Sequence, residues 1–530
     1  MGALPGRTEV LVAGGGPVGL AAAVELSSRG IDCVVVEPRR GVSHARPRCK
    51  TVNVRTMEHL RRWGVADRFR ERAPLPVSWS SDVVFCTSLA GRELSRFTGV
   101  LGLDPGDLSA EPGQQAPQYV LEELLRDVVA AAPGCRLVTG ATVVGVEQDE
   151  REARVSVADP EAGRRVIRAD YVLGCDGPRS AVRDAIGSAY VGGQALRPNF
   201  GMVFRAPRLW GDVRHGPAVQ FWTVNADAPA LMGPIDRDGT WWIIAFGIDE
   251  ADGRARGPEI VDAAAGVRTG AEILSVDPWT ARMMLVDRAG AGRVFLAGDA
   301  AHLIPPFGGH GLNTGIGDAV DLGWKLAAVL RGWGGRGLLA SYEAERRPVQ
   351  DRVIREAEAN MRTLSVDLVG DDLDRDGPDG ERARRAVRDR IQETKHAEFH
   401  ALDLVLGVSY RDSPIVVGAG ASADDVVAGA RLPHRRLDDG RALHDLLGPD
   451  FTLLAPGDPD PSLPDAATAT GVPLAVRRSP LRRYVLVRPD QHVAWHGDEL
   501  PADPRALLDH VRGDAPAHRD DHRAEAGAPR

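Results

Sequence analysis

The chain has 530 residues, and its ordinary apolar share of 43% supports several domains with packed cores. Its formal net charge of −9 is spread along the sequence, which argues against nucleic-acid binding. No stretch approaches the roughly 18 apolar residues of a membrane helix, and the N-terminus lacks the pattern of a signal peptide. We therefore predict neither a membrane span nor secretion.

The cysteines are odd in number and irregular in spacing, and none forms a Cys-x-x-Cys pair. This pattern suits reduced thiols, so we predict a cytoplasmic protein, and we expect no metal site. The cysteines are Cys33, Cys49, Cys86, Cys135 and Cys175.

The first elements predict a strand, a glycine turn, a helix and a second strand. Residues 9–13 form an apolar run with β-branched side chains, which is typical of a buried strand. Residues 18–28 have helical spacing and Gly30 ends them, and residues 31–36 are the next strand. Glu37 closes the unit.

This unit has the features of a dinucleotide-binding fingerprint. Gly14 permits a tight turn, Gly16 lets a pyrophosphate approach the backbone, and Gly19 lets helix and strand pack closely. The phosphates are expected at the positive end of the helix. Glu37 would accept hydrogen bonds from an adenosine ribose with a free 2′-hydroxyl, as in FAD or NAD. The predicted contacts are Gly14, Gly16, Pro17, Val18, Gly19 and Glu37.

Two later segments repeat the pattern of a strand that ends in a polar turn. The strand 171–173 runs into Gly-Cys-Asp-Gly at 174–177, and the strand 292–297 runs into Gly-Asp-Ala-Ala-His at 298–302. A glycine-rich loop, 305–313, then opens a helix that we expect from about 315 to 330. Such a loop offers free N–H donors and a positive helix end to a negatively charged ring.

With these three segments in this order, the chain resembles the class A flavoprotein aromatic hydroxylases. This para-hydroxybenzoate hydroxylase superfamily includes phenol hydroxylases and antibiotic-tailoring oxygenases such as the rebeccamycin-pathway flavoenzyme. The likeness covers nearly the whole chain and is specific for the superfamily but not for a substrate. Five further segments fit it: 55–58, 117–122, 345–348, 485–490 and 493–495.

The resemblance implies an α/β fold: a Rossmann-like FAD-binding domain, an inserted mixed β-sheet substrate domain and a C-terminal thioredoxin-like domain. We place the FAD-binding domain at 1–74, 104–182 and 280–400, and the substrate domain at 75–103 and 183–279. The thioredoxin-like domain would be 401–514. Because it contains no cysteine, thiol redox chemistry is excluded and a structural or dimer-forming role is expected. The polar tail 515–530 is expected to be disordered.

The resemblance also implies roles for individual residues in FAD binding. Asp176 and Gly177 would lie near the pyrophosphate and help to handle the nicotinamide donor, and Asp299 would bind the ribityl hydroxyls. The backbone from Pro306 to Asn313 would line the isoalloxazine. The implied FAD residues beyond the fingerprint are Arg48, Gln118, Asp176, Gly177, Asp299, Pro306, Gly309, Gly311, Leu312 and Asn313. His302 is interpreted as structural.

Aromatic residues concentrate between the second and third segments, where 200–204, 219–224 and 240–248 read as strands. Residues 83–89 add another candidate strand. Because side chains alternate along a strand, only one of Phe221 and Trp222, and one of Trp241 and Trp242, can face a pocket. For each aromatic residue, core packing and substrate contact are open alternatives. The predicted substrate-binding residues are Phe204, Trp222, Met232 and Trp242.

Two side chains are candidate catalytic residues. Lys50 lies where some phenol-type relatives place Asp or His, and an ammonium there would stabilise a phenolate. His310, in the glycine-rich loop, would titrate or donate a hydrogen bond near the ring. The alternatives are a surface position for Lys50 and a side chain turned away from the ring for His310.

The predicted function is an FAD-dependent, NADH- or NADPH-using monooxygenase. It would use O2 to hydroxylate an aromatic substrate, phenolic or polycyclic, through a flavin C4a-hydroperoxide. Two alternatives stay open: Baeyer–Villiger or multistep oxidation on the same scaffold, and a catalytically idle flavoprotein that binds a pathway intermediate. The Trp-x-Trp-x-Ile-Pro segment of flavin halogenases is missing.

Overall fold

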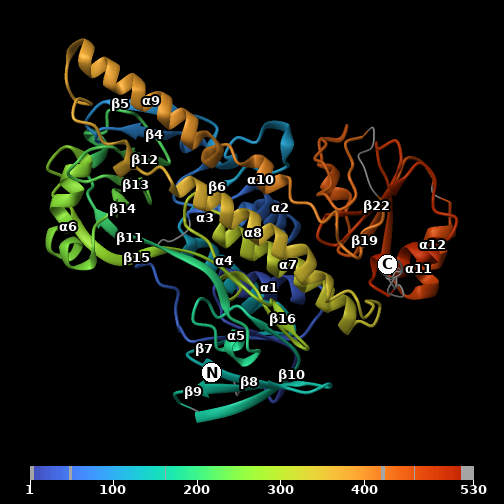
Figure 1. Ribbon diagram of the computed structural model, residues 1–530. Helices are drawn as coiled ribbons and strands as arrows, with labels where there is room; N and C mark the ends of the chain where they lie inside the picture. The colour runs from blue at the N-terminus through green and yellow to red at the C-terminus, as the bar shows by residue number, and fades with distance from the viewer. Residues whose placement is uncertain (1–4, 47–49, 162, 419–423, 459, 515–530) are drawn as a thin grey trace, which may run out of the picture.

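The computed structural model describes residues 5–46, 50–161, 163–418, 424–458 and 460–514. Arg48, Cys49 and the tail from residue 515, which figure in the predictions above, lie outside these ranges. The described chain contains a Rossmann-like sheet, a second large sheet and a C-terminal α/β unit, and the long helices α7 and α8 run through the middle (Figure 1).

The Rossmann-like sheet has a parallel core in the order β17-β10-β1-β2-β7. β1 and β2 are apolar runs buried along nearly their whole length, as expected for parallel strands covered on both faces. Parallel strands end at the same edge of a sheet, so the three glycine-rich segments that follow β1, β10 and β17 meet there. The strands are β1 (Arg7–Ala13), β2 (Cys33–Glu37), β7 (Cys135–Thr139), β8 (Thr142–Gln148), β9 (Ala153–Asp159), β10 (Gly163–Gly174), β16 (Gly290–Ala291) and β17 (Val294–Leu296).

Helices cover this sheet. α1 (Pro17–Ser27) is mostly apolar and buried, because it is enclosed between the sheet, α4 (Gln118–Ala131) and α7 (Gly311–Leu330). Its buried Glu25 pairs with Arg29 and Arg62. α7 begins one turn before the predicted start at 315, because its low-propensity glycines hide the first turn from a sequence pattern. The other helices of this region are α2 (Val54–Arg62), α3 (Ala66–Arg72), α4 (Gln118–Ala131), α5 (Ala181–Ala185) and α8 (Ser341–Met361).

The second sheet has the order β18-β15-β11-β14-β13-β12-β4-β5, with β4 and β12 parallel. β11 and β15 are long strands that pair along most of their length, and the domain boundary expected at 279 falls inside β15. The strands are β4 (Val83–Cys86), β5 (Glu93–Phe97), β11 (Tyr190–Arg205), β12 (Gln220–Thr223), β13 (Ala230–Pro234), β14 (Thr240–Phe246), β15 (Glu272–Val286) and β18 (His302–Leu303).

The two faces of the second sheet pack against different helices. α6 (Glu250–Ala265) covers one face, where Phe221 and Trp241 are buried. Trp222 and Trp242 belong to the other face, which meets α9 (Gly377–Phe399) and the glycine-rich loop. The predicted alternation within each aromatic pair is therefore confirmed.

The C-terminal unit is a mixed sheet in the order β20-β19-β21-β22. Its core continues into α7 through Trp324, which lies against Phe451, so this unit is docked on α7. The segment before Gly448-Pro449 forms only a 3₁₀ turn, Leu443–Leu446. The remaining elements are α10 (Leu402–Leu406), β19 (Phe451–Ala455), α11 (Ser462–Thr470), β20 (Leu474–Arg478), β21 (Tyr484–Val487), β22 (Val493–Gly497) and α12 (Pro504–Val511).

A membrane-spanning helix is not found in the described ranges, where no helix combines the necessary length and apolarity.

Candidate active site

The three glycine-rich segments touch one another at the edge of the Rossmann-like sheet. Gly14 has φ +99°, and a Cβ atom there would lie 2.2 Å from the carbonyl oxygen of Cys175. A Cβ atom on Gly298 would lie 2.9 Å from Val18 Cγ2. Residues far apart in the chain therefore form one continuous surface, and only glycine fits at its crowded points.

The start of α1 has the geometry of a pyrophosphate site. A Cβ atom on Gly19 would lie 2.0 Å from Gly14 O, so helix and strand approach closely. Gly16 has no atom within 4 Å of such a Cβ, which leaves its backbone open to a ligand. The helix begins at Pro17 and no side chain caps it, so its first N–H groups are available to phosphate oxygens.

Glu37, at the end of β2, lies beside the first glycine-rich segment. Its carboxylate is buried and accepts hydrogen bonds from Gly15 N at 2.7 Å and from Arg39 Nε at 2.7 Å. Arg39 also pairs with Glu122, which accepts from Gln118 Nε2 at 2.7 Å. Gln118 begins α4. Sequence reasoning missed Arg39, although a basic residue two positions after the acidic residue of the fingerprint can be recognised in the sequence.

The other two segments present carboxylates at the same edge. Asp176 Oδ2 accepts from Val182 N at 3.2 Å, and burial raises the pKa of this carboxyl group. Its Oδ1 atom is buried and has no hydrogen-bond partner among the described residues. Gly177 has φ +81° and open space around it. Asp299 is exposed, while its carbonyl oxygen accepts a hydrogen bond from the Tyr190 hydroxyl.

The flavin loop, defined here as residues 306–313, turns sharply through Gly308 and Gly309 at φ +87° and +69°. It runs into α7, where the first α-helical hydrogen bond is from Thr314 N to His310 O at 2.9 Å. The N–H groups of residues 311–313 have no acceptor within α7, so this helix end can receive negative charge. Pro306, Gly311 and Leu312 offer only backbone or apolar groups here.

Asn313 holds the loop to the rest of the site. Its amide donates to Thr51 O at 2.9 Å and Gly309 O at 2.7 Å, and its oxygen accepts from Asn53 N at 3.0 Å. Thr51 belongs to the short strand β3 (Thr51–Val52), which pairs with β6 (Gln114–Gln115). The side chain of Asn313 is therefore used within the protein, and its backbone is what remains for a cofactor. Together, these segments fit FAD from adenosine to ring.

His302 is structural, as interpreted from the sequence. Its Nε2 atom lies 2.8 Å from Asp318 Oδ2, and both side chains are buried. Burial raises the pKa of Asp318, but Arg346 and His302 outweigh it and lower the pKa to about 2. Asp318 also accepts from Gly298 N at 3.2 Å, so this ion cluster fixes the third glycine-rich segment against α7.

Lys50 lies between the flavin loop and the second sheet. Its Nζ atom donates to Pro234 O at 2.7 Å and lies 4.6 Å from the ring centroid of Trp242. The neighbouring Thr51 packs closely against Gly309 of the loop. Burial lowers the pKa of Lys50 to about 7, and no described acidic side chain offsets this effect. The surface alternative for Lys50 is therefore wrong.

The side chain of His310 does not lie against the face of the second sheet that carries Trp242. Its ring lines two small cavities of about 60 and 20 Å³ that it shares with Asn53 and Val405. The residues around these two cavities include neither Trp222 nor Trp242, although Leu101 beside the smaller one packs in the same core as these tryptophans. Burial lowers the pKa of His310 to about 4, so the imidazole is neutral at pH 7. The structure brings Lys50, but not His310, to the aromatic face.

The predicted substrate-binding residues are divided between the two faces of the second sheet. Trp242 is on the face toward Lys50 and keeps 9% of its surface exposed, whereas Trp222 is fully buried behind Phe307. Phe204 and Met232 pack in the opposite core, against α6, and cannot contact a ligand held beside Lys50. Sequence reasoning could not assign them to a face, because strand register was unknown. It also missed Ile244 and Trp279, which are only partly buried on the Trp242 face.

We name the partly exposed part of this face the aromatic wall. It consists of Trp242, Ile244 and Trp279.

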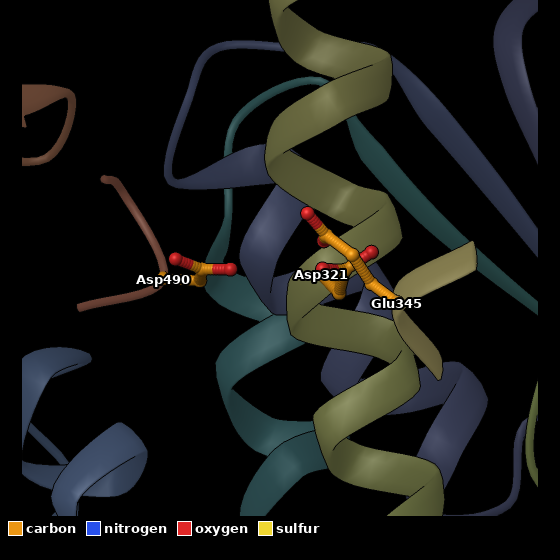
Figure 2. Close-up of side chains that lie close together, drawn as sticks. All are labelled: Asp321, Glu345 and Asp490. Atoms are coloured by element: carbon orange, nitrogen blue, oxygen red, sulfur yellow. The ribbon is translucent and has the colours of Figure 1, made fainter. Parts of the chain in front are cut away.

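A buried cluster of charges joins α7, α8 and the C-terminal unit. Asp321, Glu345 and Asp490 carry carboxylates close enough together to hold a metal ion (Figure 2). Two cations of the chain are already among them. Lys325 Nζ lies 2.8 Å from Asp321 and 2.6 Å from Glu345, and Arg488 contacts Glu345 at 2.6 Å and Asp490 at 2.7 Å. We call these five residues the junction cluster.

A Lys50→Met protein should be more stable than the wild type at pH 6, by about 2 kcal/mol, because a buried ammonium without a counter-ion costs free energy. The folded pKa of Lys50 is about 7, against an ordinary value of 10.5. Between these values the unfolded chain holds a proton that the folded protein has lost, so wild-type stability rises with pH and the advantage of the variant shrinks. Urea unfolding across this range measures both effects. A variant less stable than the wild type at pH 6 contradicts the placement.

Comparisons with known proteins agree with this geometry. Residues 7–357 match the family model described as "FAD binding domain", and residues 425–515 match "Aromatic-ring hydroxylase, C-terminal". The tetracenomycin B2 monooxygenase-dioxygenase of Streptomyces olivaceus is 32% identical over 95% of this chain and 97% of its own length.

Solved structures give the same result. The rebeccamycin biosynthetic enzyme RebC with reduced flavin superposes with a TM-score of 0.88, at 37% identity, over 97% of this chain and all of that one. The aklavinone-11 hydroxylase complex with FAD and aklavinone has a TM-score of 0.79, at 26% identity, over 96% of this chain and 99% of that one. The chain is thus an FAD-dependent monooxygenase of the aromatic-ring hydroxylase family, the class A flavin monooxygenases.

Proposed function

We propose that this monooxygenase uses NADH or NADPH and O2 to hydroxylate a phenolic or polycyclic aromatic compound held against the aromatic wall. The observation that carries the proposal is the position of Lys50, whose ammonium adjoins Trp242 while the next residue packs on the flavin loop. A ring on this wall would have both a charge for its oxygen substituent and the cofactor beside it. The names of several relatives refer to polyketide or other polycyclic compounds, which supports a natural-product substrate.

Bound FAD would supply the redox chemistry, accepting two electrons from NAD(P)H and activating O2. The protein's own residues have three further tasks. The glycine-rich segments and Glu37 bind the cofactor, the buried face behind Trp242 excludes water, and Lys50 holds or takes a proton at the substrate oxygen. Few catalytic side chains are needed, since most of the chemistry belongs to the cofactor.

A panel experiment tests this function. The FAD-loaded protein is mixed with NADH or NADPH and a series of phenols and polycyclic aromatic compounds, and NAD(P)H oxidation is measured beside peroxide release. We expect at least one compound to stimulate oxidation while peroxide falls and an oxygenated product appears. Tight binding of a compound that stimulates no NAD(P)H oxidation would instead support an idle, sequestering flavoprotein.

Lys50 should make substrate affinity depend on pH. Whether the affinity falls below or above pH 7 distinguishes a phenolic substrate from a carboxylate. A phenol ionises near pH 10, whereas Lys50 has a pKa of about 7. A phenol can donate a hydrogen bond to neutral Lys50, so its affinity is level between pH 7 and about 10 and falls about tenfold per pH unit below pH 7. A carboxylate requires the ammonium form, so its affinity is level below pH 7 and falls above it.

In the Lys50→Met protein, the change of slope near pH 7 should be absent from the plot of affinity against pH, whichever acid group the substrate carries. Substrate dissociation constants, measured through the absorption change of bound FAD, report this for both proteins. Arg237→Met is the matched control, because Arg237 lies near the ring of Trp79 rather than the aromatic wall. An unchanged pH profile in Lys50→Met removes Lys50 from the substrate site.

A further inference from the structure

The lysines of this chain have an unusual distribution. There are three lysines against 62 arginines, and all three lysines are buried: Lys50 is 7% exposed, and Lys325 and Lys395 have no exposed surface. An ammonium is a compact point charge, whereas a guanidinium is larger and planar. A chain that otherwise uses arginine thus has lysine at sites that need the compact cation. Lys325 belongs to the junction cluster and Lys50 lies beside the aromatic wall, which leaves Lys395 to be explained.

Lys395 lies on α9 behind the aromatic wall. Its Nζ atom donates to Asn360 O at 2.8 Å and to Glu398 Oε2 at 2.7 Å. It also lies 4.4 Å from the ring centroid of Trp222 and 6.0 Å from that of Phe307. One buried cation therefore contacts the end of α8, the second sheet and the flavin loop.

Glu398 completes this connection one helical turn later. It is 2% exposed, and burial raises its pKa, although Lys395 works in the opposite direction. The backbone N–H of Gly308 faces its carboxylate and favours the charged form, which lowers the pKa against the effect of burial. Gly308 is a turn residue of the flavin loop, with φ +87°. A buried acidic side chain therefore lies beside the turn that sets the course of the loop.

Aromatic side chains also connect the flavin loop to the second sheet. Phe307, the residue before Gly308, lies 6.3 Å from Trp222 and 6.2 Å from Phe246 between ring centroids. Trp222 in turn stacks on Phe85 at 5.3 Å. The flavin loop and the packing behind the aromatic wall are consequently in direct contact, and the Lys395–Glu398 ion pair lies beside them.

We propose that the Lys395–Glu398 pair is a positioning pair that fixes the flavin loop relative to the aromatic wall, and so sets the distance between cofactor ring and substrate. The proposal rests on the proposed function for its substrate side. Neither residue is catalytic, because both act through Gly308, Phe307 and Trp222. Small displacements of reacting groups have large effects on rate. Loss of the pair should therefore lower the amount of product formed per NAD(P)H consumed, while FAD still binds.

Lys395→Met and Glu398→Gln test this role, with Arg388→Met as the control. Arg388 lies on the same helix and donates to Leu94 O at 2.9 Å, away from the loop. We expect both pair variants to bind FAD within about threefold of wild type. The absorption bands of their bound FAD should shift, and product formed per NAD(P)H should fall about tenfold or more. Arg388→Met should show neither change.

Unaltered FAD absorption together with unaltered product yield in either folded pair variant overturns the proposal. If Lys395→Met fails to fold, Glu398→Gln decides, because it keeps the shape of the side chain while it removes the charge that pairs with Lys395. The absorption spectrum needs no substrate. It therefore tests the positioning of the loop even if the panel of aromatic compounds yields no product, which separates failure of this proposal from failure of the proposed function.

Discussion

A Gly16→Ala protein should fold normally and yet bind FAD about 100-fold more weakly, a loss of about 2.7 kcal/mol. An added Cβ atom meets nothing within 4 Å in the protein alone, so the fold tolerates it. The same atom occupies the space through which a pyrophosphate must approach the backbone at the start of α1. FAD titration gives the affinity, and thermal unfolding of the FAD-free protein gives the stability.

Gly19→Ala is the matched comparison, since it adds the same atom three residues later. Helix propensity alone predicts a gain of about 1 kcal/mol in unfolding free energy. Packing predicts the reverse, because the added Cβ would lie 2.0 Å from Gly14 O. We expect the FAD-free protein to lose about 2 kcal/mol or more. If Gly16→Ala binds FAD as well as the wild type does, the pyrophosphate lies elsewhere.

An Arg488→Met protein should lose about 3–5 kcal/mol of stability in its C-terminal unit, because breaking a buried ion pair leaves charges without partners. Arg488 is fully buried and bonds to both oxygens of Glu345, at 2.6 and 2.8 Å, and to Asp490 at 2.7 Å. Without it, the Asp490 carboxylate loses its ion pair with arginine and keeps the contacts with His492, from the backbone N–H at 3.2 Å and the ring at 3.4 Å. Hydrogen exchange of the amides in β19 and β21 measures the free energy of opening.

Arg441→Met is the control for this prediction. Arg441 belongs to the same C-terminal unit but pairs with Asp439 at the surface, where both side chains are more than half exposed. Such pairs contribute within about 0.5 kcal/mol. Adding Glu345→Gln to Arg488→Met should restore part of the lost stability, because it removes one of the three buried carboxylates that are then left with Lys325 as the cation of the cluster. Equal effects of Arg488→Met and Arg441→Met would show that the junction cluster does not hold the C-terminal unit.

The strands and turns that bind the cofactor could be predicted because their signals are local. An apolar run, a glycine turn and an acidic residue specify the β1–α1–β2 unit without help from the rest of the chain. The meeting of the three glycine-rich segments follows from their placement after parallel strands. Alternation along a strand likewise places Trp241 and Trp242 on opposite faces of the second sheet from their adjacency alone.

The remaining features depend on partners distant in the chain. Phe204 and Met232 were assigned to the substrate because neighbouring strands could not be put in register, and they belong to the α6 side. His310 was considered for catalysis because its loop is near the cofactor, but loop sequence does not specify side-chain direction. The sequence alone does not single out Lys395, because a lysine in a charged helical segment usually faces solvent.

Some segments that supported the family resemblance have a structural explanation at the domain junction. Arg55 donates to Asp490 O at 2.6 Å, and Glu58 pairs with Arg431, so the segment 55–58 holds the C-terminal unit. The segments 345–348 and 485–490 supply Glu345 and Arg488 to the junction cluster. These motifs therefore maintain the architecture, whereas we assign the site itself to the glycine-rich segments and Lys50.

Isotopic labelling of the oxygen source tests the proposed hydroxylation most directly. The FAD-loaded protein, with NAD(P)H and the aromatic compound that best stimulates its oxidation, is supplied with heavy-isotope O2, and the product is examined by mass spectrometry. The account predicts one labelled oxygen atom in each product molecule and one NAD(P)H consumed for each. Unchanged compound, or oxygen derived from water, would contradict it.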